Sequence, residues 1–187
     1  MLRSLKGLRD FTIGATDDAI GKVHSFFFDG QTWAIRYLLA DTGTWLPGRQ
    51  VLVAVTALGQ PNWEGRIFPV ALTKEQVKES PDIDTDKPVS RQREVELHQH
   101  YGWAPYWGMG YGVPVGGVPA PPPVDAKEVN EAAKGDPNLR STRELNGYHI
   151  HATDGSIGHV DDFIASEGDW MIRYLVVDTR NWLPGRH

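Results

Sequence analysis

The sequence contains one segment twice, and this repetition constrains the fold more than any other feature. The segment from Leu8 to Arg49, LRDFTIGATDDAIGKVHSFFFDGQTWAIRYLLADTGTWLPGR, returns from Leu145 to Arg186 as LNGYHIHATDGSIGHVDDFIASEGDWMIRYLVVDTRNWLPGR. The copies align without a gap at a constant offset of 137 residues, and roughly half of the aligned positions are identical. The repeat therefore predicts two copies of one small module.

The second copy is shorter than the first. His187 aligns with Gln50, so the segment that begins VLVAV in the first copy has no counterpart. We therefore expect an incomplete second module with an unpaired strand edge, which would recruit a strand from another chain. If the natural chain continues, its next residues should instead resemble VLVAVTALGQPNWEGRIFPVALT.

Length and composition limit the class of protein. A chain of 187 residues holds one ordinary domain or two small ones, and the long repeat offset favours two. The absence of cysteine excludes disulfides, thiolate metal sites and cysteine nucleophiles. The charged start MLRSLKGLRDF does not resemble a secretory signal, and no apolar run approaches the roughly 18 residues of a membrane span. We expect a cytoplasmic protein without direct membrane insertion.

Charge excludes another class of partner. The net charge is −5, and no cluster of lysine and arginine is longer than RQR. Nucleic-acid-binding proteins usually carry a basic stripe that neutralises phosphates. We therefore expect no nucleic-acid partner.

The first copy reads as a series of short β-strands. Its apolar segments are rich in β-branched and aromatic residues: FTI, IGKVHSFFFD, WAIRYLLAD, VLVAV and RIFPVAL. Turn-forming pairs such as Asp29-Gly30 and Thr42-Gly43 lie between them, which is typical of antiparallel hairpins in a small barrel or sandwich. In WAIRYLLAD, strict alternation places Trp33, Ile35, Tyr37 and Leu39 on one face. Both faces are largely apolar, which predicts a central strand.

Helices are predicted mainly outside the repeats. Thr73 with Gln76, and Asp125 with Glu128, form capping boxes at the starts of two expected helices, and 90–101 is a third. The segment 101–124, YGWAPYWGMGYGVPVGGVPAPPPV, reads as a Gly/Pro-rich linker whose aromatic side chains can dock on a surface. The expected organisation is a first module at 1–80, a helical and Gly/Pro/aromatic-rich linker at 81–140, and a truncated second module at 141–187.

The repeated strands resemble a known family. ATDDAIGKV and ATDGSIGHV, followed by WAIRYLLADT and WMIRYLVVDT, are similar to the PRC-barrel superfamily. That superfamily includes the cytoplasmic domain of the photosynthetic reaction-centre H subunit and the C-terminal domain of a ribosome maturation factor. Two such modules joined by an aromatic linker resemble bacterial two-repeat PRC-barrel proteins. The resemblance implies a mainly β chain of two small antiparallel PRC-type β-barrels, the second incomplete, with short flanking helices. It implies interaction modules and supplies no catalytic residue.

The most conspicuous repeated motif is DTGTWLPGR, which returns as DTRNWLPGR. As a binding loop, it would offer tryptophan and arginine, which are common at interaction hot spots. Alternatively, its aspartate and Pro-Gly pair only shape the turn, and its tryptophan packs onto the end of the barrel. The candidate binding residues are Trp45, Leu46, Arg49, Trp182, Leu183 and Arg186.

Two other polar motifs favour structural roles. Asp17 and Asp154 precede tight turns, where single acidic residues usually form the turn and do not bind a cation. Arg36 and Arg173 lie in the middle of apolar strands, so a structural ion pair with Asp29 or Asp41 is expected.

Histidine pairs raise a metal-site hypothesis. His-x-His occurs at His98 and His100 and again at His149 and His151. Residues i and i+2 share one face of a strand but diverge on a helix, where the first pair lies. Two ligands do not complete a site, and neither hydrolase nor phosphate-binding signatures are present.

The sequence thus favours a non-enzymatic interaction or scaffold protein made of tandem PRC-barrels. Its protein partner is unknown, and a homo-oligomer through the unpaired edge of the second barrel is one expectation. No catalytic residue, metal or cofactor is predicted. One alternative is a peripheral component of a membrane complex, resembling the H-subunit cytoplasmic domain in photosynthetic electron transport. The other is a metal-dependent enzyme that uses the histidine pairs.

Overall fold

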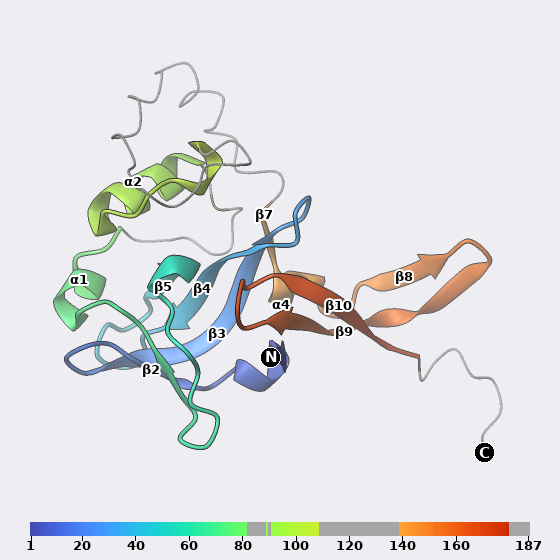
Figure 1. Ribbon diagram of the computed structural model, residues 1–187, viewed down its shortest axis with the longest axis horizontal. Helices are drawn as coiled ribbons and strands as arrows, with labels where there is room; N and C mark the ends of the chain where they lie inside the picture. Colours follow the sequence, from blue (N-terminus) through green and yellow to red (C-terminus); the bar gives the residue numbers. More distant parts are fainter. Residues whose placement is uncertain (82–88, 90, 109–138, 180–187) are drawn as a thin grey trace.

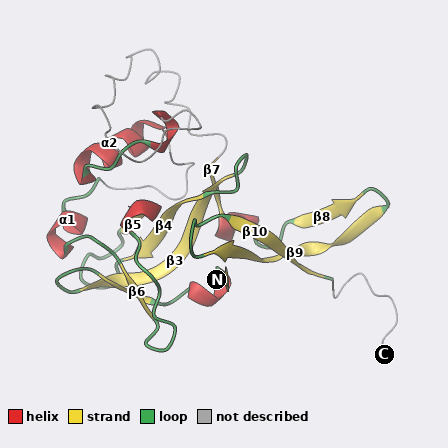
Figure 2. Cartoon of the chain, in the orientation of Figure 1, coloured by secondary structure: helices red, strands yellow, loops and turns green. Residues whose placement is uncertain are grey.

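The computed structural model is mainly β, and its strands form two sheets (Figures 1 and 2). Among the described residues, the larger sheet has six strands and the smaller has four. Short helices lie around the larger sheet. The residues that the structure describes are 1–81, 89, 91–108 and 139–179.

The larger sheet is built on the first copy of the repeat. Its strand order is β5-β4-β3-β2-β6, and β7 pairs with the far end of β3. Each strand coincides with an apolar segment predicted from the sequence, except β7. The strands are β2 (Thr12–Gly14), β3 (Ala19–Asp29), β4 (Ile35–Asp41), β5 (Gln50–Ala54), β6 (Ile67–Pro69) and β7 (Leu139–Ser141).

Strand β4 is central, as predicted, because it pairs with β3 on one side and β5 on the other. The predicted alternation is wrong at its start. Ile35 lies in the same apolar cluster as Leu38, whereas Tyr37 lies in the cluster on the opposite face. The reason is a register shift: Phe28 faces Ile35 but Phe27 faces Tyr37, which leaves Arg36 as an extra residue. Such a bulge reverses the faces of the residues on either side of it.

The ends of the larger sheet approach each other. Leu58, shortly after β5, forms an isolated bridge with Val70, which directly follows β6. Backbone hydrogen bonds of 2.8 Å join Gly59 N to Pro69 O and Ala71 N to Ala57 O. The described strands nevertheless do not form a closed ring, so closure into a barrel stays a prediction.

The smaller sheet is built on the second copy. Strand β9 is its centre and pairs with β1, β8 and β10, all antiparallel. Within the described residues, β10 pairs only with β9. The strands are β1 (Leu2–Ser4), β8 (His149–Ala152), β9 (Gly155–Ser166) and β10 (Ile172–Asp178).

The two copies exchange their first strands. Strand β1 precedes the first copy but pairs with β9 of the second, with Leu2 opposite Ser166. Strand β7 precedes the second copy but pairs with β3 of the first, with Leu139 opposite Asp29. Both strands have the sequence LRS, at the same offset of 137 residues as the rest of the repeat. The expected boundaries near residues 80 and 141 therefore do not separate two independently built sheets.

The contact between the copies is self-complementary. Ala34 bridges Met171, which is its own counterpart in the other copy. Around this bridge, Ile35 N donates to Trp170 O and Ile172 N donates to Trp33 O, both at 2.9 Å. Equivalent residues thus make reciprocal contacts, as at the isologous interface of a two-fold dimer.

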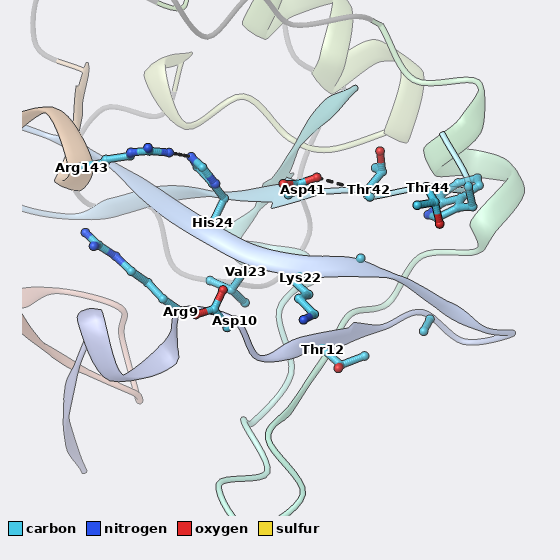
Figure 3. A pocket seen from close by; sticks show the side chains of 14 residues that line it. Arg9, Asp10, Thr12, Lys22, Val23, His24, Asp41, Thr42, Thr44 and Arg143 are labelled. Carbon is cyan, nitrogen blue, oxygen red and sulfur yellow. Dashed lines mark hydrogen bonds between the residues drawn. The ribbon is translucent and has the colours of Figure 1, made fainter. Parts of the chain in front are cut away.

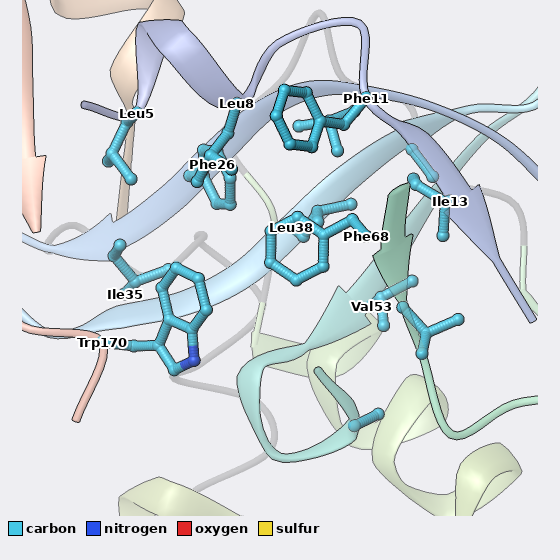
Figure 4. Packing of buried hydrophobic residues seen from close by; sticks show 14 of the residues in the cluster. Leu5, Leu8, Phe11, Ile13, Phe26, Ile35, Leu38, Val53, Phe68 and Trp170 are labelled. Atoms are coloured by element: carbon cyan, nitrogen blue, oxygen red, sulfur yellow. The ribbon is translucent and has the colours of Figure 1, made fainter. Parts of the chain in front are cut away.

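One apolar core extends across both copies (Figure 4). Trp170 of the second copy is only 7% exposed and stacks on Phe68, with 5.6 Å between ring centroids. It also lies 6.4 Å from Phe26. Because the second copy contributes Trp170 to the core of the first, the first copy does not complete its core alone.

Equivalent glycines allow each long strand to cross its neighbour closely. A Cβ on Gly21 would lie 2.1 Å from the carbonyl oxygen of Asp41, and φ is +145°. A Cβ on Gly158 would lie 2.1 Å from the carbonyl oxygen of Asp178, with φ of +137°. Only glycine fits such an approach, which explains the repeated Ile-Gly of the motif.

The helices confirm part of the prediction. Helix α1 (Lys74–Lys78) has the expected capping box, in which Thr73 and Gln76 each bind the other's backbone N–H. Helix α2 (Arg91–Tyr101) covers one face of the larger sheet (Figure 1). The helix expected after Asp125 lies outside the described residues. The remaining short helices are η1 (Lys6–Leu8), η2 (Val55–Ala57), η3 (Tyr106–Gly108) and α4 (Thr142–Leu145).

Candidate functional site

In the first copy, the WLPGR loop makes its contacts with the protein itself. The indole Nε1 of Trp45 donates to Ile20 O at 2.9 Å, and the ring packs partly buried against the core. The Thr42 hydroxyl lies 2.8 Å from Leu46 O and 2.7 Å from Arg49 O, so its single proton is shared between these two carbonyl oxygens across the loop. Asp41 accepts from Gly43 N at 2.9 Å and shapes the turn.

The arginine of this loop also points inward. The guanidinium of Arg49 donates to Lys78 O at 2.7 Å and to Ser80 O, at the end of α1. Leu46 is half-buried. These contacts are those of a structural turn, and a binding role for Trp45, Leu46 and Arg49 stays a prediction. The second-copy residues Trp182, Leu183 and Arg186 lie outside the described residues.

The two strand arginines both form ion pairs, but Arg36 does so with a predicted partner, whereas Arg173 pairs with Asp169 in place of Asp29 or Asp41. Arg36 forms an ion pair with Asp29 over 3.1 Å. Burial works against ionisation of Asp29, but hydrogen bonds from Gln31, Thr32 and Arg36 outweigh it and keep the pKa of this carboxyl below its usual range. Asp17 accepts from Lys74 N at 2.9 Å, so it fixes the turn to α1.

The histidine pairs do not converge with other ligands. His98 is buried on α2, and its Nε2 lies 2.9 Å from the Tyr37 hydroxyl, whereas His100 is exposed and contacts Gln76 O. They therefore diverge, as expected on a helix. His149 and His151 are both exposed on β8. Within the described ranges, no three potential ligands gather to form a metal site.

A buried polar cluster joins α2 to the larger sheet. The Tyr37 hydroxyl donates to Glu94 Oε1 at 2.8 Å, and the Tyr106 hydroxyl donates to the same oxygen at 2.5 Å. Glu94 is fully buried, and Arg36 lies over the Tyr106 ring at 4.2 Å. Because buried polar groups stabilise a structure only when they are hydrogen-bonded, this cluster fixes α2 and the start of the linker on the sheet.

A surface groove of about 690 Å³ opens where the two copies meet (Figure 3). Residues of the turn before β2, of β3 and of the turn after β4 line it, and α4 of the second copy contributes one arginine. Its ionisable lining residues are Arg9, Asp10, Lys22, His24, Asp41 and Arg143.

His24 and Arg143 face each other in this groove (Figure 3). The His24 Nε2 atom and the Arg143 guanidinium are in direct contact. Burial and the nearby Arg143 charge together lower the pKa of His24 below its ordinary value of 6.5. The imidazole is therefore mostly neutral at pH 7. The side chain that faces the Arg143 guanidinium thus carries no negative charge.

Sequence reasoning did not find this groove. Its residues belong to different elements, and Arg143 lies 119 positions from His24. A signal was present in the repeat itself, because His24 and Arg143 differ from their counterparts Asp161 and Lys6. Comparing charges between the two copies would have identified the position.

The second copy leaves apolar side chains uncovered. Tyr174 is 61% exposed, whereas its counterpart Tyr37 is fully buried. Leu175 is 37% exposed, whereas Leu38 is fully buried. In the first copy, α2 covers Tyr37 on one face of β4, and Leu38 lies in the apolar core on the other face. The same sequence pattern therefore produces a core in one copy and an apolar surface in the other.

Comparison with known proteins gives no named function. No family model matches the chain. An uncharacterized protein of Deinococcus radiodurans is 35% identical over 99 residues, which is 46% of this chain and 35% of that protein. The match spans about a third of that relative's length. None of the helices in the described ranges is long and apolar enough to cross a membrane.

Proposed function

We propose that this chain is a non-enzymatic interaction module of the PRC-barrel type, which takes up an extended strand of a partner protein along β10. The observation that carries the proposal is the difference between equivalent positions: Tyr174 and Leu175 are exposed where Tyr37 and Leu38 are fully buried. Because neighbouring residues of a strand point to opposite faces of the sheet, both faces of β10 lack, among the described residues, the cover that β4 has at the equivalent positions.

The backbone of β10 supports strand addition. Its counterpart β4 pairs with β5 from Tyr37 opposite Ala54 to Asp41 opposite Gln50. In the described part of the chain, β10 has no strand in the place of β5. An exposed edge presents unpaired N–H and C=O groups, which a peptide in extended conformation can pair.

The first copy indicates what the added strand should look like. Strand β5 has the sequence QVLVA, and its residues Val51 to Val53 are fully buried. A partner strand along β10 would bury its side chains in the same way, so we expect an apolar, β-branched segment. A second copy of this chain and a different protein are both compatible with that chemistry.

The resemblance to PRC-barrels has support in the fold. The repeated ATD-x-x-I-G turn leads into the long strands β3 and β9, and the repeated RYL segment lies in their partners β4 and β10. The larger sheet also brings its two ends together through Leu58 and Val70. These features fit a small curled barrel.

A labelled peptide tests the proposal. The probe has the sequence of residues 49–57, RQVLVAVTA, and its binding to the chain is followed by fluorescence anisotropy. Leu175→Lys places a charge on the proposed surface and should weaken binding at least tenfold. Ile67→Lys is the matched control, because Ile67 is 42% exposed on the larger sheet and should leave binding unchanged. Absence of binding, or equal binding by both variants, would contradict the proposal.

Light scattering across a concentration series identifies the source of the strand. A dimer that Leu175→Lys dissociates would assign the partner strand to a second copy. A monomer that binds the peptide would assign it to a different protein.

The WLPGR loop needs a separate test. Trp45→Ala removes the hydrogen bond to Ile20 and part of the packing, so it should lower the free energy of unfolding by about 1 to 2 kcal/mol. If peptide binding and self-association are unchanged, the loop is structural. Loss of either with an intact fold would assign the loop a binding role.

A further inference from the structure

The groove at the junction has a counterpart on the other side of the approximate two-fold relation. There, Lys6 Nζ lies 2.6 Å from the carboxylate of Asp161. The same two positions in the groove are occupied by Arg143 and His24. Both pairs therefore contain a cation, Arg143 in the groove and Lys6 at the counterpart. The partner of the cation is an imidazole in the groove and a carboxylate at the counterpart.

Both pairs occupy the same structural positions. His24 is an extra residue in the pairing of β3 with β4, because Val23 faces Ala40 while Ser25 faces Leu39. Asp161 is the extra residue in the pairing of β9 with β10, between Val160 and Asp162. Because a bulge re-aims the side chain that it carries, both side chains are presented to the exchanged segment of the other copy.

The groove carries further positive charge. Arg9 and Lys22 line it together with Arg143, and within the described residues none of the three has an ion-pair partner within 4.0 Å. Their counterparts across the two-fold relation are Asn146, His159 and Lys6. The concentration of cations is therefore specific to this side.

Two acidic residues also face the groove. Asp10 and Asp41 raise the pKa of His24, but burial and Arg143 outweigh them. The Asp41 carboxylate is engaged by Gly43 N. Three cations against two carboxylates leave a positive site around His24, in a protein whose net charge is −5.

We propose that this groove binds a small anion with a phosphate or carboxylate group, which the Arg143 guanidinium and the His24 imidazole hold together. The anion takes the role that the Asp161 carboxylate plays toward Lys6. Guanidinium groups bind such oxyanions through two parallel hydrogen bonds. Arg9 and Lys22 add attraction over the short distances that salt does not fully screen.

Anion binding should be coupled to protonation of His24. A negative charge beside the imidazole stabilises its protonated form, so the bound anion raises the pKa of His24. By linkage, affinity for the anion increases as pH falls through the range in which His24 titrates. Sulfate is a suitable probe for this range because its charge does not change there.

The first experiment titrates the 187-residue chain with inorganic phosphate, and separately with succinate, while NMR follows the histidine ring signals. The His24 signal should shift in a saturable manner. Phosphate and succinate together distinguish the two oxyanion classes. If neither anion shifts the His24 signal up to tens of millimolar, the proposal is wrong.

Three variants make the test specific. His24→Asp supplies the residue found in the other copy, so an internal ion pair with Arg143 should replace the anion and reduce affinity at least tenfold without loss of stability. Arg143→Gln should reduce affinity to a similar extent. Lys6→Gln, the matched control on the other side, should leave affinity unchanged. Equal affinity in all three variants would show nonspecific binding and overturn the proposal.

The reciprocal change provides an independent check. Asp161→His recreates the groove pair beside Lys6 and should add a second, weaker anion site to the chain. The added histidine signal should then shift with phosphate. If the signal of the added histidine stays unchanged while the His24 signal shifts, Arg9 and Lys22 are required for anion binding. Replacing both by glutamine should then abolish binding at His24.

Discussion

The two copies of the repeat share roughly half of their residues, but they do not reach the same structure. In the first copy, Tyr37 is fully buried and bonded to Glu94 and His98 beneath α2. In the second copy, the equivalent Tyr174 is 61% exposed. Burial therefore depends on the strands and helices that surround the repeat, and the repeated residues alone do not determine it.

The tryptophans at the centre of the junction provide the strongest test of this difference. Trp170 is 7% exposed among Phe26 and Phe68, whereas its counterpart Trp33 is 41% exposed and stacks on Phe28. Trp170→Ala should lower the free energy of unfolding by about 3 to 5 kcal/mol, because it leaves a cavity in the core. Trp33→Ala should cost about 1 kcal/mol. Urea denaturation measures both, and equal costs would refute the comparison.

The close-approach glycines give the next largest effect. Gly21→Ala places a methyl group against the Asp41 carbonyl in a sheet held on both sides, so a loss of about 3 kcal/mol is expected. Gly158→Ala creates the same overlap with Asp178 at the sheet edge, where β10 can move, and should cost less. Thermal unfolding monitored by circular dichroism compares the two. A larger loss of stability for Gly158→Ala would contradict the view that the second sheet adjusts more easily to the added methyl group.

Glu167 tests which contacts hold the exchanged strand β1 against the second copy. Its carboxylate accepts hydrogen bonds from Arg3 at 2.8 Å and from Trp63 at 3.1 Å. Burial disfavours its charge, but these contacts outweigh burial and hold its pKa below the ordinary 4.5. Its contribution to stability is therefore present above pH 4.5 and is lost as pH falls through the lower folded-state pKa.

Replacing this residue should reduce that acid sensitivity. Glu167→Gln is expected to cost about 1 to 2 kcal/mol at neutral pH, and the difference from the parent protein should shrink toward pH 3. Denaturation curves collected at several pH values measure the difference. Glu64→Gln, at an exposed position in the loop before β6, is the control and should have little effect at any pH. A cost for Glu167→Gln that does not change with pH would exclude the charge as its source.

The smallest expected effect concerns His24. Because its pKa is lowered in the folded protein, the unfolded chain binds more protons, and stability falls as pH drops below 6.5. His24→Gln should weaken this fall in an anion-free buffer. In saturating sulfate, the parent protein should lose less stability over the same pH range. If sulfate stabilises the His24→Gln variant equally, its effect does not involve the groove.

Much of the local structure could be predicted from the sequence. The apolar segments became strands, Thr73 and Gln76 formed the predicted capping box, and Arg36 paired with Asp29. These features depend on neighbouring residues, whose geometry is fixed by backbone periodicity and turn chemistry. Local patterns are therefore reliable here.

The arrangement of the strands could not be predicted in the same way. Three residues, LRS, are too few to define a strand by their pattern, and nothing local indicates that β1 pairs with the second copy. The bulge at Arg36, which reversed the expected face of Ile35, depends on the register of two strands. The groove between His24 and Arg143 depends on the strand exchange and was therefore missed as well.

Strand exchange also affects how the protein is made. Arg3 finds its partner Glu167 at a separation of 164 residues, and β3 receives β7 only after the linker has been synthesised. At typical elongation rates of about 5 to 20 residues per second, β1 waits on the order of ten to thirty seconds on the ribosome before β9 emerges. During that interval the first sheet lacks β7 and Trp170. Completion of both sheets is therefore a late event in biosynthesis, and a nascent chain arrested within the second copy would expose the core of the first.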